Sequence, residues 1–306
     1  MKILVTGGAG FIGSHLVDRL IKKGNQVSVI DNLSTGKKEN LNPRAEFFLE
    51  NIRSRSIQTI FSKRNFDLVY HLAAQVVISK ATKNPIKDAK DNILGTLNIL
   101  DVSARYKVKK MFYANSVTCF GEPDDLPINE NHPIQPLSFY ALSKYTASIY
   151  TNLYSNYYNL PSIINIFANV YGPRQSPFGE GGVIAIFSYK MLKGQPIEIF
   201  GNGEQTRDFI FVDDLVDAIT LSTNLKNETF TIGTEIETSI NTLFKEIAAL
   251  TNYPKKPIYR PKREGDVLKS VLSIKKAQKM LKFKPNTSLE KGLLKTFQYF
   301  KDNFKD

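Results

Sequence analysis

Tyr140 and Lys144 lie four residues apart within residues 139–158, where the sequence pattern predicts one long helix. Residues at this spacing share one face of a helix. An ammonium group beside a phenol stabilises the phenolate and lowers the tyrosine pKa from its usual value of about 10, so Tyr140 could act as a general base. The pair has a second interpretation as an exposed helix pair, since the chain contains 14 tyrosines.

Ser116 follows a predicted strand over residues 110–114. The carboxyl ends of parallel strands form the edge where open α/β sheets bind their ligands, so the Ser116 hydroxyl could bond the same substrate oxygen as Tyr140. In isolation, a serine at such a place is more often a turn or cap residue. Its combination with Tyr140, Lys144 and the nucleotide motif below favours a catalytic set.

A glycine-rich turn connects a predicted strand over residues 2–6 to a predicted helix over residues 10–23. Its candidate cofactor-binding residues are Gly7, Gly10, Phe11, Ile12 and Gly13. Glycine is needed where the backbone turns tightly and where its amides approach a pyrophosphate at a helix N-terminus. Glycine-rich turns also simply end strands, so this motif depends on its context.

Asp31 supplies that context, because it ends the next predicted strand at the sequence distance expected of the carboxylate that accepts both ribose hydroxyls. An acid at this position repels a 2′-phosphate, which favours NAD over NADP. Lys37 and Lys38 follow closely and could argue for a phosphate, but we interpret them as loop charges.

Strand-length apolar runs alternate with helix-length amphipathic segments through the first half of the chain. This alternation predicts an α/β fold, a Rossmann-type doubly wound parallel sheet, followed by a smaller C-terminal substrate-binding domain. We place the NAD-binding domain at residues 1–167, with 209–235 returning to it, and the substrate-binding domain at 168–208 and 236–306. The two long predicted helices, 88–105 and 139–158, could pair with a second copy, so we expect a homodimer.

Composition narrows the classes of protein. Of 306 residues, 42% are hydrophobic and 23% charged, which is ordinary for a globular protein. The net charge of +12 is dispersed and lacks the aromatic platforms of a nucleic-acid binder. No apolar run approaches the roughly 18 residues of a membrane span. Because Cys119 is the only cysteine, we expect a cytoplasmic protein. We also expect no nucleic-acid partner, no membrane partner and no metal.

The chain resembles the extended short-chain dehydrogenase/reductase family, and within it the UDP-hexose 4-epimerases, over essentially its whole length. The resemblance rests on the glycine-rich turn and on the motifs Asp31-Asn32-Leu33-Ser34-Thr35-Gly36, His71-Leu72-Ala73-Ala74-Gln75, Asn92 with Gly95-Thr96, Tyr140 with Lys144, Asn169-Val170-Tyr171-Gly172-Pro173-Arg174, Arg207-Asp208-Phe209 and Arg263-Glu264-Gly265-Asp266. It implies a bound NAD that oxidises a UDP-sugar at C4 and returns the hydride to the opposite face.

The resemblance also implies roles for single residues. Tyr140 would be the base for the sugar 4-hydroxyl, Lys144 would lower its pKa and hold the nicotinamide ribose, and Ser116 would assist the proton transfer. Further cofactor-binding residues would be Asn32, Ser34, Thr35, Gly36, Asn51, Ile52, Leu72, Ala73, Ala74, Gln75 and Asn92. Substrate-binding residues would be Ser116, Asn169, Gly182, Val183, Arg207, Arg263, Asp266 and Ser270.

Only a few residues of the sequence bear on the choice of substrate. Arg207 and Arg263 would neutralise the diphosphate, although both could instead form surface salt bridges. Ser270 stands where, by the resemblance, epimerases restricted to UDP-glucose and UDP-galactose carry a tyrosine, so UDP-N-acetylglucosamine could also be accepted. Val117 and Thr118 argue against the related 4,6-dehydratases and decarboxylases, which carry acidic residues there. UDP-glucuronic acid 4-epimerisation and a noncatalytic dinucleotide-binding protein remain as alternatives.

Overall fold

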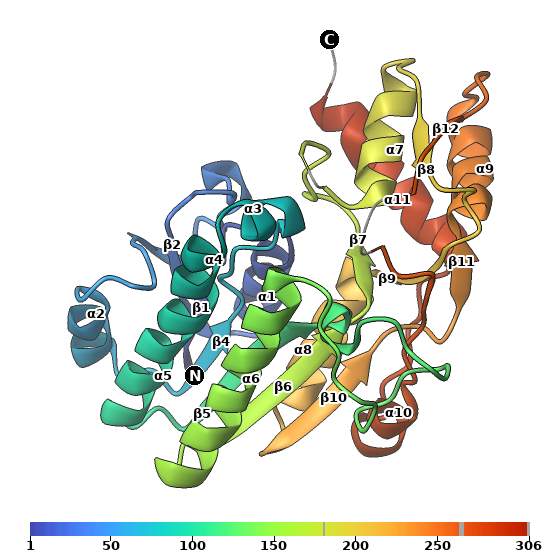
Figure 1. The fold of residues 1–306 in the computed structure, drawn as a ribbon. Helices are drawn as coiled ribbons and strands as arrows, with labels where there is room; N and C mark the ends of the chain where they lie inside the picture. The colour runs from blue at the N-terminus through green and yellow to red at the C-terminus, as the bar shows by residue number, and fades with distance from the viewer. Residues whose placement is uncertain (180, 263–265, 305–306) are drawn as a thin grey trace. The chain divides into compact units, whose positions relative to one another are not determined.

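The computed structural model describes residues 1–179, 181–262 and 266–304, and it contains a seven-stranded sheet (Figure 1). The strand order is β10-β6-β5-β4-β1-β2-β3. The strands are β1 (Lys2–Thr6), β2 (Gln26–Asp31), β3 (Glu46–Leu49), β4 (Leu68–His71), β5 (Lys110–Ser116), β6 (Ser162–Phe167) and β10 (Glu228–Ile232). Pairing is parallel from β3 through β2, β1 and β4 to β5, which confirms the predicted α/β fold class.

The chain reverses its direction of winding at β1. From β1 it proceeds outward to β2 and β3, and then returns to the other side of β1 with β4 and β5. This reversal is the topological switch point of doubly wound sheets, and ligands bind there at the carboxyl ends of the strands. The ends of β1, β2, β4 and β5 therefore carry the candidate site.

Helices connect most of these parallel strands, whereas the connection from β2 to β3 contains only a short 3-10 helix (Lys38–Asn40). They are α1 (Phe11–Lys22), α2 (Ile57–Arg64), α3 (Ile78–Lys83), α4 (Pro85–Ala89), a π-helical segment (Lys90–Leu94), α5 (Gly95–Arg105) and α6 (Phe139–Tyr157). The region predicted as one helix over residues 88–105 is helical but interrupted by the π-helical segment. Thr96 Oγ1 donates to the Asn92 carbonyl at 2.6 Å, a side-chain bond that competes with the regular helical ladder.

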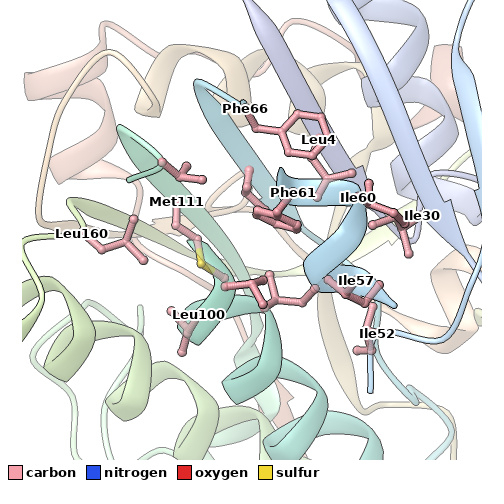
Figure 2. Close-up of a cluster of buried hydrophobic side chains, with 14 residues drawn as sticks. Leu4, Ile30, Ile52, Ile57, Ile60, Phe61, Phe66, Leu100, Met111 and Leu160 are labelled. Atoms are coloured by element: carbon pink, nitrogen blue, oxygen red, sulfur yellow. The ribbon is translucent and has the colours of Figure 1, made fainter. Parts of the chain in front are cut away.

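An apolar cluster packs around the first strands of this sheet (Figure 2). Leu4 of β1, Phe61 of α2, Leu100 of α5 and Met111 of β5 all contribute to it and are fully buried. Burying one such side chain contributes about 1.5–3 kcal/mol. The cluster thus fixes α2 and α5 relative to the strand ends that carry the site.

The chain divides into two compact units, and the first comprises Met1–Cys119, Pro136–Ile166 and Ile219–Phe230. The second comprises Phe120–Gln135, Phe167–Ala218 and Thr231–Asp306. The sequence contains no signal that would assign residues 120–135 to the second unit; there Ile128 pairs with Leu272. None of the described helices is long and apolar enough to span a bilayer.

A mixed sheet forms the centre of the second unit. Strand β9 (Thr206–Phe211) pairs with β7 (Asn169–Tyr171) and β13 (Lys269–Ser270) in parallel and with β11 (Glu237–Ser239) antiparallel. A separate parallel pair consists of β8 (Glu198–Phe200) and β12 (Ile258–Arg260). The accompanying helices are α7 (Val183–Leu192), α9 (Ile240–Thr251), α10 (Lys275–Leu281) and α11 (Leu289–Asn303), and α8 (Val212–Ser222) belongs to the second unit as far as Ala218.

Candidate active site

The glycine-rich turn leaves β1 and enters α1 with very little space. Gly7 has φ +74°, a left-handed conformation that favours glycine, and its N–H donates to the Ile30 carbonyl at 2.8 Å. A Cβ on Gly13 would lie 2.1 Å from the Gly7 carbonyl oxygen, so no other residue fits there. The turn can therefore keep its path only with glycines at these two positions.

Helix α1 begins at this turn without a competing cap. Its N-cap residue is Gly10, which has no side chain that could cap the helix, and no acidic residue lies in the first turn. The first N–H groups of a helix lack intrahelical acceptors and, with the helix dipole, attract anions. This helix N-terminus can therefore accept a phosphate group.

Asp31 ends β2 beside the same turn, and its carboxylate is held by the backbone. Its Oδ2 accepts from Ala9 N–H at 3.0 Å and its Oδ1 accepts from Leu33 N–H at 2.8 Å. An ionised carboxylate has about four acceptor positions. Two positions therefore stay available to ribose hydroxyls, while the two backbone bonds fix the orientation of the group.

The other predicted cofactor residues lie in loops after strands of this sheet. Asn32, Ser34, Thr35 and Gly36 follow β2, Asn51 and Ile52 follow β3, and Leu72, Ala73, Ala74 and Gln75 follow β4. The structure brings the third group against the glycine-rich turn, because a Cβ on Gly7 would lie 2.8 Å from the Ala73 nitrogen. Asn51 Oδ1 accepts from the backbone and side chain of Arg53, and Ile52 packs in the apolar cluster of Figure 2.

Ser116, Tyr140 and Lys144 are brought together by β5 and α6. Ser116 is the last residue of β5, and α6 starts just before Tyr140 with Ser138 Oγ accepting from Ala141 N–H at 3.1 Å. Ser116 Oγ accepts from Thr118 Oγ1 at 3.0 Å and hydrogen-bonds Tyr140. Because Thr118 occupies an acceptor position of Ser116, the serine proton can be directed to the tyrosine oxygen.

Burial shifts the pKa values of Tyr140 and Lys144. It raises the pKa of Tyr140 to about 12, while the hydrogen bond from Ser116 acts in the opposite direction. It lowers the pKa of Lys144 to about 7, and the nearby charge of Asp88 opposes that change. Burial thus favours the neutral forms of both side chains, and any group that favours the charged form of Lys144 changes the reactivity of the pair.

Lys144 also lies against an aromatic ring that sequence reasoning missed. Its Nζ is 4.2 Å from the ring centroid of Tyr113 on β5, which is the geometry of a cation–π interaction. Tyr113 Oη in turn donates to the Lys144 carbonyl at 3.1 Å. The sequence signal was weak, since an aromatic residue in a buried strand is usually only part of the core.

A buried polar network joins the predicted residues Gln75 and Asn92 to α6. Asn92 Nδ2 donates to Ser143 Oγ at 3.0 Å and to the Gln75 carbonyl at 3.0 Å, and Asn92 Oδ1 accepts from Gln75 N–H at 2.8 Å. Both residues also donate to Asp88 Oδ1. The side-chain amides of Gln75 and Asn92 are therefore hydrogen-bonded to other groups of the protein. Sequence reasoning missed Asp88, whose only signal is its position one helical turn before Asn92.

Apart from Ser116, which lies in the first unit, the predicted substrate residues that the structure describes belong to the second unit. Arg207 Nη2 lies 2.7 Å from Asp266 Oδ1, and Ser270 pairs with Arg207 in the parallel register of β13 and β9, so these three lie together. Asn169 begins β7, and Gly182 and Val183 form the start of α7. Arg263 lies outside the described residues. Within residues 1–179, 181–262 and 266–304, no group of three or more His, Cys, Asp or Glu side chains could hold a metal.

Comparisons with known proteins show what this chain is similar to. Residues 3–233 match the sequence model described as the NAD dependent epimerase/dehydratase family. The chain is 45% identical over 302 residues to a Methanocaldococcus jannaschii protein provisionally named UDP-glucose 4-epimerase, covering 98% of this chain and 99% of that one. The Thermotoga maritima UDP-glucose 4-epimerase, solved with UDP-glucose, is 44% identical with a TM-score of 0.98 and full coverage of both chains.

A related solved structure has another substrate in its name. The UDP-N-acetylglucosamine 4-epimerase of Methanobrevibacter ruminantium is 31% identical, with a TM-score of 0.94 and 98% of each chain covered. The family match covers most of the chain, including the glycine-rich turn, Asp31, Ser116, Tyr140 and Lys144. On these grounds the protein belongs to the NAD dependent epimerase/dehydratase family.

Proposed function

We propose that this protein is an NAD-dependent 4-epimerase that interconverts UDP-glucose and UDP-galactose through a transient 4-keto sugar. The observation that carries the proposal is the group formed by the half-buried Ser116 and the buried Tyr140 and Lys144, next to a glycine-rich turn that fits a dinucleotide. Two relatives at 44–45% identity carry the UDP-glucose 4-epimerase name, which supports the same substrate class.

The described residues fit NAD. The uncapped N-terminus of α1 would hold the pyrophosphate, and the backbone-held carboxylate of Asp31 would accept the ribose hydroxyls. An anionic carboxylate at this position disfavours the 2′-phosphate of NADP. When bound, NAD supplies first the hydride acceptor and then the hydride donor.

Tyr140 is the proposed acid and base. Its phenolate oxygen takes the proton of the sugar 4-hydroxyl during oxidation and returns it to the same oxygen during reduction, so no net proton is consumed. A phenol whose pKa burial raises to about 12 needs stabilisation of its anion, and two groups can provide it. Ser116 donates a hydrogen bond, and the Lys144 ammonium lies one helical turn away on α6.

The residues after Ser116 favour epimerisation over elimination or decarboxylation. Elimination of water needs an acid and a base beside the reacting carbons. Val117 has no exchangeable proton, and the hydroxyl of Thr118 donates to Ser116. These side chains support the 4-epimerase over the 4,6-dehydratase and decarboxylase alternatives, although UDP-glucuronic acid decarboxylases occur among the relatives.

For the sugar nucleotide we propose the second-unit residues. Arg207 would bind the diphosphate, with Asp266 orienting its guanidinium, and Arg263 would contribute a second cation. Asn169 would contact the sugar, and Gly182 and Val183 would line the nucleotide pocket. The small, 7%-exposed side chain of Ser270 would leave room for an N-acetyl group, so we extend the proposal to UDP-N-acetylglucosamine.

Proton NMR of the purified protein tests the activity directly. The protein is mixed separately with UDP-glucose, UDP-N-acetylglucosamine and UDP-glucuronic acid, without added NAD. Anomeric signals of the galacto-configured product are expected with UDP-glucose, which would also indicate that NAD is retained on purification. Conversion of UDP-glucuronic acid alone would replace the proposed substrate. Silence with all three sugars after NAD is supplied would contradict the epimerase proposal.

We further propose a homodimer that forms through α6. One face of α6 is buried in the first unit, whereas Leu142, Ile149, Leu153 and Tyr157 are 41–80% exposed and recur at helical spacing. A second copy of the same apolar face would cover them. Light scattering should give twice the mass of 34.6 kDa, and Leu153→Lys should yield the single mass; a monomeric wild type would refute the dimer.

A cytoplasmic location completes the proposal. It is supported by the buried, free thiol of Cys119, which suits a reducing compartment.

A further inference from the structure

We propose that Asp88 is a positioning residue that keeps the ammonium form of Lys144 beside Tyr140, because its buried carboxylate is the counter-charge of that lysine. The inference rests on the proposed role of Tyr140 and Lys144 in catalysis. It adds a residue of α4 to the two residues of α6, and no motif of the sequence analysis includes it.

The carboxylate of Asp88 is buried and held from one side only. The residue is 1% exposed, and its Oδ1 accepts from Gln75 Nε2 at 2.8 Å and from Asn92 Nδ2 at 3.2 Å. Its Oδ2 is buried without a hydrogen-bond partner among the described residues. A buried anion that lacks full hydrogen bonding needs a nearby cation to offset the loss of hydration.

Lys144 is the cation that meets this need. It is 5% exposed, α4 packs against α6, and the charge of Asp88 acts on Lys144 against the effect of burial. The ring of Tyr113 contacts the same Nζ. An ammonium group is stabilised both by the charge of a nearby carboxylate and by contact with an aromatic face.

Other titratable groups surround this pair and do not replace Asp88. The Lys144 charge acts on His71 of β4, and Tyr140 interacts electrostatically with Tyr113 and Cys119. None of these three side chains supplies an anion near neutral pH, since burial favours their neutral forms. The lysines of α3 and α4 are exposed to solvent: Lys80, Lys83 and Lys87.

Removing the Asp88 charge lowers two pKa values, that of Lys144 and that of Tyr140. Lys144 loses its counter-charge, so its pKa falls and the ammonium is lost at lower pH. Tyr140 loses a negative neighbour that raises its pKa, so the phenolate forms at lower pH. If the enzyme needs a charged Lys144 and an ionisable Tyr140, both limbs of the pH–rate profile therefore move toward acid.

Asp88→Asn isolates the charge, because the amide keeps Oδ1 as an acceptor for Gln75 and Asn92. The kcat/KM for UDP-glucose is measured from about pH 5.5 to 9.5 in the purified holoenzyme, and the limb set by Lys144 should shift toward acid by about one pH unit. Asp91→Asn is the matched control, since Asp91 lies three residues further on and pairs with Arg53 and Lys87. The limbs of the pH–rate profile should not move in Asp91→Asn. Asp88→Glu retains the charge and should restore the limb positions even where the rate is lower.

Urea unfolding gives a second test that needs no turnover. The attraction between Asp88 and Lys144 exists while Lys144 is charged, below its pKa of about 7, and disappears above it. The loss in unfolding midpoint caused by Asp88→Asn should therefore be larger at about pH 6 than at about pH 9. An equal loss at both pH values would overturn the inference whether or not the protein is an epimerase. Unmoved limbs of the pH–rate profile in an active enzyme would also overturn it.

Discussion

Asn92 Nδ2 donates a 3.0 Å hydrogen bond to Ser143 Oγ, which ties the π-helical segment Lys90–Leu94 to helix α6 at the residue before Lys144. The same amide exchanges two hydrogen bonds with the backbone of Gln75, after β4. One fully buried side chain thus connects three segments that are separate in sequence. The position of Lys144 therefore depends on Asn92.

Asn92→Ala should lower the free energy of unfolding by about 2 kcal/mol or more, because it leaves the N–H and carbonyl of Gln75 without partners, and a buried group that loses its partner costs about 1–3 kcal/mol. Urea denaturation measures the change. Asn131→Ala, at an exposed position, is the control and should stay within about 0.5 kcal/mol of the wild type. Equal effects of the two substitutions would mean that the network does not stabilise the fold.

The sequence predicts the parts of the site that one short segment carries. The glycine-rich turn, Asp31 and the spacing of Tyr140 and Lys144 are local patterns, and the structure places them at strand ends and on one helix. The contacts of Asp88, Tyr113 and Asn92 join different segments through tertiary packing, so no local pattern signals them. The interruption of the helix after Ala89 coincides with side-chain bonds of Asn92 and Thr96 to residues one helical turn earlier.

Gly13→Ala should abolish tight retention of NAD. The new Cβ would meet the Gly7 carbonyl oxygen at 2.1 Å, so the turn must open and the amides at the start of α1 must move. The NAD content of the purified protein, measured after acid release, should fall at least about tenfold, which corresponds to a binding cost of about 1.4 kcal/mol.

Gly24→Ala provides the control for that substitution. Gly24 also has a positive φ, of +81°, but a Cβ there would meet no atom within 4 Å. The control should therefore lose a little stability and keep its NAD. If Gly13→Ala retained as much NAD as Gly24→Ala, the glycine-rich turn would not be the pyrophosphate site.

Tyr140→Phe should reduce kcat with UDP-glucose by about two or more orders of magnitude while NAD stays bound, because the substitution removes the proton-transferring oxygen and keeps the ring. Tyr150→Phe, on the exposed side of the same helix, should retain the wild-type kcat. Turnover is followed by NMR, and NAD by its absorbance after release. Turnover in Tyr140→Phe near that of the wild type would mean that another residue moves the proton.

His71 should make the fold sensitive to acid. It is 1% exposed, with Nδ1 2.7 Å from Thr6 Oγ1 and Nε2 3.0 Å from Thr96 Oγ1. Because the Thr96 hydroxyl donates to the Asn92 carbonyl, it accepts from Nε2–H, and Nδ1 then accepts from Thr6. Burial, together with the charge of Lys144, lowers the pKa of His71 to about 3.

The sign of the pH effect follows from the unfolded state, which takes up this proton near the ordinary histidine pKa of 6.5. The neutral ring contributes its full stability above that value and loses it as the pH falls toward 3, by up to about 1.4 kcal/mol per pH unit. Urea unfolding between about pH 7 and 4.5 should be less steeply pH-dependent in His71→Gln than in the wild type. His132→Gln, at a less buried position, should retain the wild-type slope, and identical slopes for all three proteins would contradict this prediction.

Ser270→Tyr should separate the two sugar substrates. Ser270 lies on β13 in register with Arg207, and its small side chain is 7% exposed, so a phenol ring there would fill space beside the proposed diphosphate-binding arginine. An overfilled site typically costs about 1–3 kcal/mol, which corresponds to about 5- to 150-fold in turnover of the bulkier substrate.

The kcat/KM for UDP-N-acetylglucosamine should therefore fall at least about tenfold, while that for UDP-glucose stays within about threefold. Ser270→Ala is the matched control, because it removes the hydroxyl without adding volume, and it should spare both substrates. If Ser270→Tyr lowered both activities together, the ring would be disturbing the strand pair β9–β13 and not the space for the N-acetyl group. Because Arg207 serves both sugars, that outcome would identify Ser270 as part of the arginine's support.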